Sequence, residues 1–286
     1  MKKKLFLLML LCFAILSSPA IGQSLSLNYD QIQTVDGEIL VPLRQVAQFA
    51  GFTVHYTQGE VTLTKEGKQV KLNLKDGTLA DNGHRVYLWP ELCVIEKIMY
   101  VPMSLLEDHL RVDPKLNRSS LTVSKVLENK ITISNQRETF EEQYLDLQLQ
   151  YPRIGGLENE AQKLINDTIK GKMAAIKEDA HKDKEEFIAN PHWSASHQVS
   201  YDTNYLVKRN RGGLLSVLFE DYRFLGGAHG NADKFAYNFD LKTGKQYSLK
   251  DLFAKDVDYV SIINKEIAAL IAGDKYKSQY YSFDSI

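Results

Sequence analysis

The chain has 286 residues, of which 44% are hydrophobic and 25% are charged. This length and balance are ordinary for a soluble globular protein with room for two domains, and no stretch is of low complexity. The 35 basic and 36 acidic side chains leave a formal net charge of −1. The charge therefore gives no electrostatic reason to expect nucleic acid or an anionic membrane surface as a partner.

Residues 1–22 have the pattern of a secretory signal peptide. Three lysines at positions 2–4 precede an apolar core at 5–16, and the small residues Ala20 and Gly22 stand before the expected cleavage point. The core is shorter than the roughly 20 residues of a transmembrane helix. We expect an exported protein without a stable membrane span after cleavage, with an uncleaved anchor as the alternative.

Two cysteines are present, Cys12 in the predicted signal and Cys93 in an apolar run. A single cysteine in the processed chain has no partner for an internal disulfide. We expect Cys93 to be a small buried hydrophobe, because free cysteines are among the most buried residue types.

Residues 27–127 contain an internal repeat. Each copy is a short apolar strand that runs into a proline, Pro42 or Pro102, and then into a helix at apolar spacing. Proline is tolerated in the first turn of a helix, where its missing N–H loses no hydrogen bond. Further alternating strands follow each helix, and turns are expected at Glu66-Gly67 and Asn82-Gly83.

This repeat resembles the copper amine oxidase N-terminal-like domain of secreted Gram-positive proteins. The resemblance implies a binding or spacing module and no oxidase activity. The cofactor tyrosine of those oxidases is followed by an acidic residue, whereas Tyr205 is followed by leucine, and the chain has no H-x-H pair. We expect no cofactor.

The sequence pattern of residues 131–286 predicts a second α+β domain. The segment 128–137 joins the domains as a stiff connection or a continuing strand. A strand at 145–151, expected to stop at Pro152, precedes a long amphipathic helix at 158–187. More strands, at 196–205 and 213–224, and a second amphipathic helix at 257–271 follow.

The stretch from Tyr222 to Phe253 organises this domain. Its loop reads Gly226-Gly227-Ala228-His229-Gly230-Asn231, and three glycines in five residues indicate positive φ or a close approach. A hairpin follows, with alternating aromatic residues, and Ser248 with Asp251 has the spacing of a capping box.

The order of GGAHG, NFDLKTGK and SLKDLF resembles the ectodomain of lysozyme-sensing anti-sigma factors and the non-catalytic region of peptidoglycan deacetylases. The resemblance covers residues 131 to the end. It implies further strands after the second helix, so we expect a domain truncated at its C-terminus.

No complete catalytic set is visible. His229 is either a ligand-facing residue or, as we favour, a structural one that fixes the loop through backbone carbonyls. Glu220 and Asp221 are adjacent on a strand and point to opposite faces. His192 and His197 lack a third ligand at a standard spacing, so we expect no metal site.

A recognition surface is a further hypothesis, because tyrosine offers a large rigid contact area. Its equally favoured alternative is a sheet with ordinary exposed tyrosines. The candidate residues are Lys208, Arg209, Arg211, Tyr201, Tyr205 and Tyr222.

We expect an α+β protein of two small domains, each with a mixed or antiparallel sheet packed by amphipathic helices. The resemblances imply a secreted, extracellular and cell-wall associated module of a Gram-positive envelope, with no catalytic residues. Its partner would be a lysozyme-like protein or peptidoglycan. The alternatives are a wall-glycan enzyme using His229 and Asp240, or a structural spacer. The predicted contact residues are Tyr222, Gly226, Gly227, His229, Gly230 and Asn231.

Overall fold

The computed structural model describes residues 24–35, 37–65, 68–81, 84–87, 92–158, 160–189 and 198–273. Several sequence predictions fall outside these ranges. They are the signal peptide with Cys12, the turns at Glu66-Gly67 and Asn82-Gly83, the histidines His192 and His197, and the expected C-terminal truncation after the second helix.

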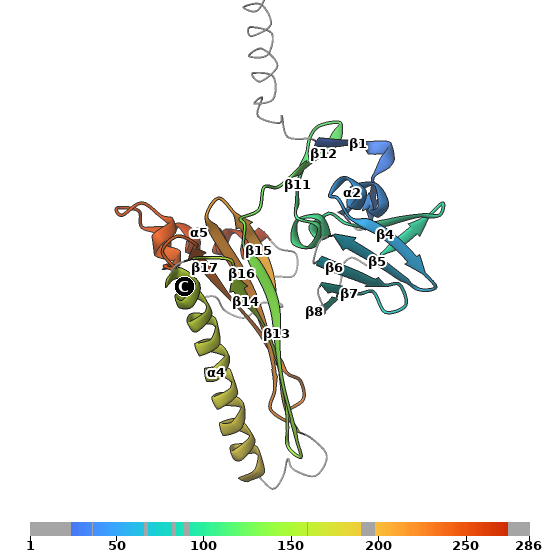
Figure 1. Ribbon diagram of the computed structural model, residues 1–286. Helices are drawn as coiled ribbons and strands as arrows, with labels where there is room; N and C mark the ends of the chain where they lie inside the picture. The colour runs from blue at the N-terminus through green and yellow to red at the C-terminus, as the bar shows by residue number, and fades with distance from the viewer. Residues whose placement is uncertain are drawn as a thin grey trace, which may run out of the picture.

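The described residues of the first domain form three antiparallel sheets around one core (Figure 1). The first sheet has the order β1 (Ser24–Asn28), β12 (Ser120–Lys125) and β11 (Val112–Leu116). The second has the order β2 (Gln33–Val35), β3 (Glu38–Pro42), β10 (Ile98–Pro102) and β9 (Cys93–Ile95). The third runs in chain order through β4 (Thr53–Thr57), β5 (Glu60–Lys65), β6 (Lys68–Asn73), β7 (Thr78–Asp81) and β8 (His84–Tyr87).

The two copies of the sequence repeat lie side by side. Their strands β3 and β10 pair antiparallel, with Val41 opposite Val101. Each strand ends at its proline, which is the N-cap of the helix that follows, α2 (Leu43–Phe49) or α3 (Met103–Leu105). The prolines therefore sit one position before the first helical turn, where their fixed φ suits both the strand end and the cap.

The helix of the second repeat copy, α3, continues as a π-helical turn, η3 (Leu106–Leu110). This turn ends at Arg111, which has a φ of +56°. One 3-10 turn, η2 (Tyr29–Gln31), follows β1. The Lys65 ammonium closes the end of α2 by donating to the Ala50 carbonyl over 2.9 Å. Cationic side chains near a helix C-terminus satisfy carbonyls that lack a partner within the helix.

The prediction for the run around Cys93 needs correction. Cys93 is only partly buried, and the next residue, Val94, is 61% exposed. The run forms β9 at the edge of the four-stranded sheet, so one side of it has no neighbouring strand among the described residues. Burial raises the pKa of the Cys93 thiol.

The second domain is a six-stranded mixed sheet with the strands in chain order. Only β14 and β15 are parallel among the described pairs. The strands are β13 (Thr132–Glu142), β14 (Leu145–Gly155), β15 (Val199–Arg211), β16 (Leu214–Phe224), β17 (Asn231–Asp240) and β18 (Gln246–Tyr247). The α+β class with a mixed sheet and an antiparallel one is confirmed.

Pro152 does not stop β14, contrary to the prediction. The strand continues to Gly155, and Pro152 lies opposite Asn135 of β13. On its other side β14 pairs with β15 only as far as Leu149. The missing N–H of Pro152 therefore lies beyond that ladder, where it leaves no inter-strand bond unmade.

Helix α4 (Glu160–Ala189) lies along one face of this sheet and supplies its core (Figure 1). The predicted apolar stripe is buried with one exception, Leu164, which is 48% exposed. Leu164 lies at the turn that follows β17, close to Gly244. The buried members are Ala161, Ile165, Ile169, Met173, Ile176 and Ala180.

After β18, the predicted capping box of Ser248 and Asp251 opens the 3-10 helix η4 (Leu249–Leu252). The second predicted helix is α5 (Tyr259–Gly273). Its apolar side is only partly buried: Leu270 is 74% exposed, whereas Val260, Ile263, Ile267 and Ile271 are half-buried. No helix in the described part of the chain combines the length and apolarity needed to cross a membrane.

Candidate functional site

The face of the second-domain sheet opposite α4 carries a set of polar side chains, which we call the outer face, and shares that face with the apolar residues Leu206, Leu218, Ala232 and Ala236. Strand alternation places it there, because residues next to each core residue point the other way. Across the five strands β13 to β17 it is roughly 20 Å wide. Its members are Arg137, Gln148, Gln150, Asp202, Asn204, Glu220, Tyr222 and Lys234.

Hydrogen bonds between and within strands connect these side chains. Gln150 Nε2 donates to Asn204 Oδ1 over 2.9 Å, and Asn204 Nδ2 donates to Asp202 Oδ1 over 2.8 Å. Arg137 Nη2 donates to Gln148 Oε1 over 3.2 Å. The ladder holds planar amides and carboxylates in fixed orientations, with donors and acceptors side by side.

Tyr222 is the aromatic member of the outer face and is 43% exposed. It lies opposite Asp202 on β15 and Ala232 on β17. A Cβ at Gly230 would stand 2.3 Å from the Tyr222 ring carbon Cζ. The ring therefore packs directly on Gly230, and this close approach is the reason for a glycine at that position.

The predicted contact residues lie on the loop between β16 and β17 and on the strand ends beside it, with Tyr222 on β16 and Asn231 at the start of β17. Gly226 has a φ of +86°, while Gly227, His229 and Asn231 are exposed. His229 Nδ1 lies 3.1 Å from the carbonyl of the next residue, Gly230. The loop brings Tyr222 and Gly230 together and places His229 beside them.

The alternative catalytic pair is separated. His229 precedes the first residue of β17, whereas Asp240 is its last. Ten strand residues span roughly 30 Å, so the two side chains do not share a site. Asp240 instead accepts hydrogen bonds from the Lys242 and Thr243 backbone N–H groups, and the bond from Thr243 is the main cause of its lowered pKa.

Glu220 and Asp221 point to opposite faces, as predicted. Glu220 pairs with Lys234 over 2.6 Å on the outer face. Asp221 is buried beneath the sheet and accepts from Thr203 Oγ1 over 2.7 Å and from Arg223 Nε over 2.9 Å. These two carboxylates have separate structural partners.

The predicted recognition surface of basic residues and tyrosines does not form. Tyr201 and Tyr205 are buried in the core, and burial raises the pKa of both phenols. Lys208 pairs with Asp108 of the first domain, and Arg211 Nη1 lies 3.6 Å from Asp113 Oδ2. Tyr222 is thus the one tyrosine of that set exposed in the described chain.

The two domains meet at the open edge of β15, beyond the point where β14 leaves it. Arg111 donates to the Val207 carbonyl, and its Nε lies 3.9 Å from Glu128 Oε1. An uncovered strand edge offers unpaired backbone groups, and the first domain covers this one. A cleft of about 160 Å³ remains at the junction, lined by charges of both signs.

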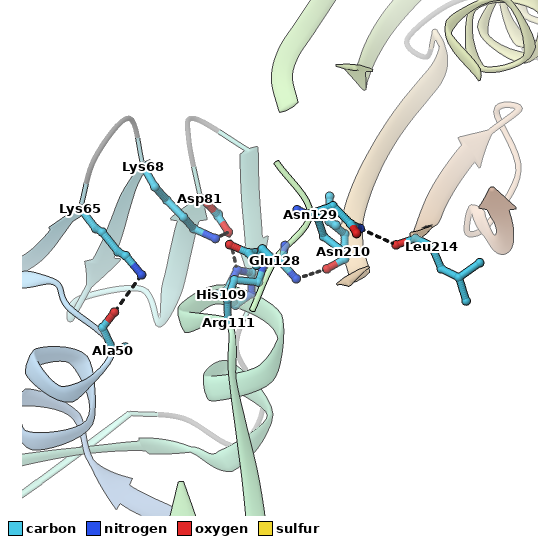
Figure 2. Close-up of polar contacts among 11 residues, drawn as sticks. Ala50, Lys65, Lys68, Asp81, His109, Arg111, Glu128, Asn129, Asn210 and Leu214 are labelled. Atoms are coloured by element: carbon cyan, nitrogen blue, oxygen red, sulfur yellow. Dashed lines mark hydrogen bonds and ion pairs between the residues drawn. The ribbon is translucent and has the colours of Figure 1, made fainter. Parts of the chain in front are cut away.

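Hydrogen bonds hold the segment that connects the two domains, in agreement with the predicted stiff connection. Asn129 clamps the β15–β16 turn by donating to the Leu214 carbonyl over 3.0 Å (Figure 2). It also accepts from Gly213 N–H over 2.8 Å. Its backbone N–H also donates to the Asn210 carbonyl over 3.1 Å. These contacts fix the start of β13 and with it one end of the outer face.

A buried charge cluster supports Arg111 from the first domain (Figure 2). Asp81 Oδ2 lies 3.0 Å from His109 Nδ1 and 3.2 Å from Lys68 Nζ. Burial alone would raise the pKa of Asp81, but the hydrogen bond from His109 and the charge of Lys68 hold it below its ordinary value. Burial lowers the pKa of Lys68.

Sequence reasoning missed both the outer face and the junction. The outer-face residues occupy the polar positions of alternating strands, a signal that marks a wet face without showing which strands adjoin. The described residues hold no group of three or more histidine, cysteine, aspartate or glutamate side chains placed to bind a metal ion.

The fold and site define a two-domain α+β protein whose second domain presents a polar sheet face. Residues 22–125 match the family described as copper amine oxidase N-terminal domain, and residues 138–232 match the family described as deacetylase PdaC. The chain therefore carries one segment similar to each family, in the order that the two resemblances predicted.

One curated relative is the peptidoglycan-N-acetylmuramic acid deacetylase PdaC of Bacillus subtilis (strain 168). It is 28% identical over 112 residues, and the match covers 34% of this chain and 24% of that protein. The chain thus spans about a quarter of the relative's length.

Two solved structures of the DUF3298 family are also similar in part. One, from Pseudomonas aeruginosa PAO1, is 17% identical with a TM-score of 0.35, covering 49% of this chain and 64% of that one. The other, from Bacteroides fragilis NCTC 9343, is 15% identical with a TM-score of 0.36, covering 54% of this chain and 70% of that one.

Proposed function

We propose that this protein is a secreted, non-enzymatic binding module of a Gram-positive cell envelope that holds peptidoglycan on the outer face. One observation carries the proposal: the exposed Tyr222 ring stands in a ladder of oriented amides and carboxylates. A carbohydrate chain offers hydroxyl and acetamido groups to such donors and acceptors, and an aromatic ring gives it a flat apolar surface.

The family matches support the same setting. The proposed cell-wall role agrees with the match to the family described as deacetylase PdaC. It also agrees with the name of the curated relative, a peptidoglycan deacetylase. The matched part is a quarter of that relative. The proposal therefore takes from that relative only the association with wall glycan.

The separation of His229 from Asp240 counts against the enzyme alternative. General acid–base catalysis needs each group within hydrogen-bond reach of the reacting atoms. Two side chains at opposite ends of a ten-residue strand do not meet that requirement around one bond.

Binding is tested by sedimenting the protein with insoluble peptidoglycan, with a lysozyme-like muramidase immobilised in parallel. The proposal predicts saturable retention on peptidoglycan, no release of soluble fragments or acetate, and no saturable capture by the muramidase. Capture by the muramidase alone would transfer the function to protein recognition. Turnover of the glycan would establish the enzyme alternative.

A further inference from the structure

The first domain contains an apolar groove that the proposed function does not use. It has a volume of about 510 Å³ and lies where the start of α2, the sheet of β4 and β5, and the β9–β10 hairpin meet. Small-molecule sites commonly have volumes of about 300–1,000 Å³ and mainly apolar walls. The residues lining it are Leu43, Arg44, Val54, Tyr56, Val61, Leu74, Val94, Lys97, Ile98 and Met99.

Three large apolar side chains in this lining are left exposed to solvent. Tyr56 is 60%, Val94 is 61% and Ile98 is 46% exposed. Single exposed apolar residues are normal on a protein surface, but a contiguous set around a hollow marks a place where something binds. The floor, by contrast, is core, with Leu43 and Val61 nearly inaccessible.

The charges on the groove have one sign. Arg44 and Lys97 are the charged members of the described lining, and no carboxylate belongs to it. Both side chains are exposed, so their charges stand at the mouth and not on the floor. Charge complementarity therefore selects a ligand that is negative at one end and apolar along its body.

The turn that carries Lys97 is strained. Glu96 and Lys97 form the two-residue link between β9 and β10, with φ values of +50° and +68°. Turns with two positive φ angles favour asparagine and glycine, because a side chain crowds the backbone there. Strain of this kind concentrates at ligand clamps, where a contact made by the side chain outweighs the energetic cost of the strained turn.

We propose that this groove binds a single-chain amphiphilic anion. Its apolar chain lies against Val94, Ile98 and Tyr56, and its anionic head lies between Arg44 and Lys97. The groove and the strained turn belong to the first domain, so this site is independent of glycan binding on the outer face.

Octanoate, octylammonium and octanol are matched probes of chain and head group. Titration calorimetry on the whole chain is expected to show octanoate binding at least about fivefold more tightly than octylammonium, since two cations face the head group. Equal binding of all three would overturn the anionic assignment. Binding to anionic lipid vesicles without binding of octanoate would also overturn it, in favour of a membrane surface.

Two variants separate a ligand role from a structural one. Lys97→Gly relaxes the positive φ and removes a cation, so we expect a higher melting temperature together with a several-fold loss of octanoate affinity. Arg44→Gln should give the same loss without the rise in melting temperature, and Arg118→Gln, an exposed site elsewhere, should change neither. Unchanged octanoate affinity in both groove variants would contradict the proposal.

Discussion

At the scale of single residues, the Tyr222 ring depends on the absence of a side chain at Gly230. In Gly230→Ala the new Cβ would stand 2.3 Å from the ring, so the ring must move off the outer face. We expect glycan affinity to fall by about 1 kcal/mol, roughly fivefold, with little change in stability. Gly171→Ala is the control, because nothing lies within 4 Å of its Cβ position and it lies on α4, away from the outer face. Equal affinities of the two variants in a sedimentation assay would contradict the role of the ring.

The lowered pKa of Asp81 predicts how the stability of the protein changes in acid. Its pKa in the folded protein lies below the ordinary value of 3.8, so its contribution is present above that pH and is lost as the pH falls through the folded pKa. Asp81→Asn should therefore lower the free energy of unfolding at neutral pH. The difference in the free energy of unfolding between Asp81→Asn and the natural protein should become smaller below a pH of about 3.8. A difference that stays constant in urea unfolding down to pH 2 would show that Asp81 gains nothing from His109 and Lys68.

At the scale of elements, the turn after β17 locks against α4 through Gly244. Its φ is +74°, and an added Cβ would stand 2.9 Å from the Ala161 Cα. Gly244→Ala should therefore cost about 2–4 kcal/mol of stability, from backbone strain and from the clash with a helix backbone. Gly213→Ala shares the positive φ, at +75°, but meets nothing within 4 Å, and strain alone should cost about 1–2 kcal/mol. Thermal unfolding that ranks the two variants equally would contradict this packing.

Periodicity predicted most elements because the cause of each is local. The stripe of α4, the alternation of β14 and the capping box at Ser248 are all visible within a few residues. Pro152 was misread because its tolerance depends on where a neighbouring strand ends. Likewise, the exposure of Leu270 on α5 depends on which other elements pack against the helix, and an amphipathic pattern does not predict that packing.

At the scale of the whole molecule, the junction lay beyond sequence reasoning. Asp81 and His109 are 28 residues apart, and Arg111 and Val207 are 96 residues apart. No spacing rule links such residues, since the sheets alone bring them together. The same is true of the outer face, where Gln150 and Asn204 meet across 54 residues.

Arg111 is the side chain on which the domain arrangement most depends. Arg111→Ala removes the donor to the Val207 carbonyl and the ion pair with Glu128, which should cost about 2–3 kcal/mol. We expect the edge of β15 to open and the radius of gyration from X-ray scattering to increase. Arg118→Ala removes an exposed arginine and should leave the scattering unchanged. A compact Arg111→Ala protein would contradict the account of the junction.

The most direct test of the central claim is the affinity for insoluble peptidoglycan of the natural protein, Tyr222→Ala and Tyr29→Ala. The last removes a tyrosine of similar exposure, 48%, from the first domain. The account predicts saturable binding that falls at least about fivefold in Tyr222→Ala and stays unchanged in Tyr29→Ala. Binding by the natural protein that survives Tyr222→Ala, or no binding by any of the three folded proteins, would contradict it.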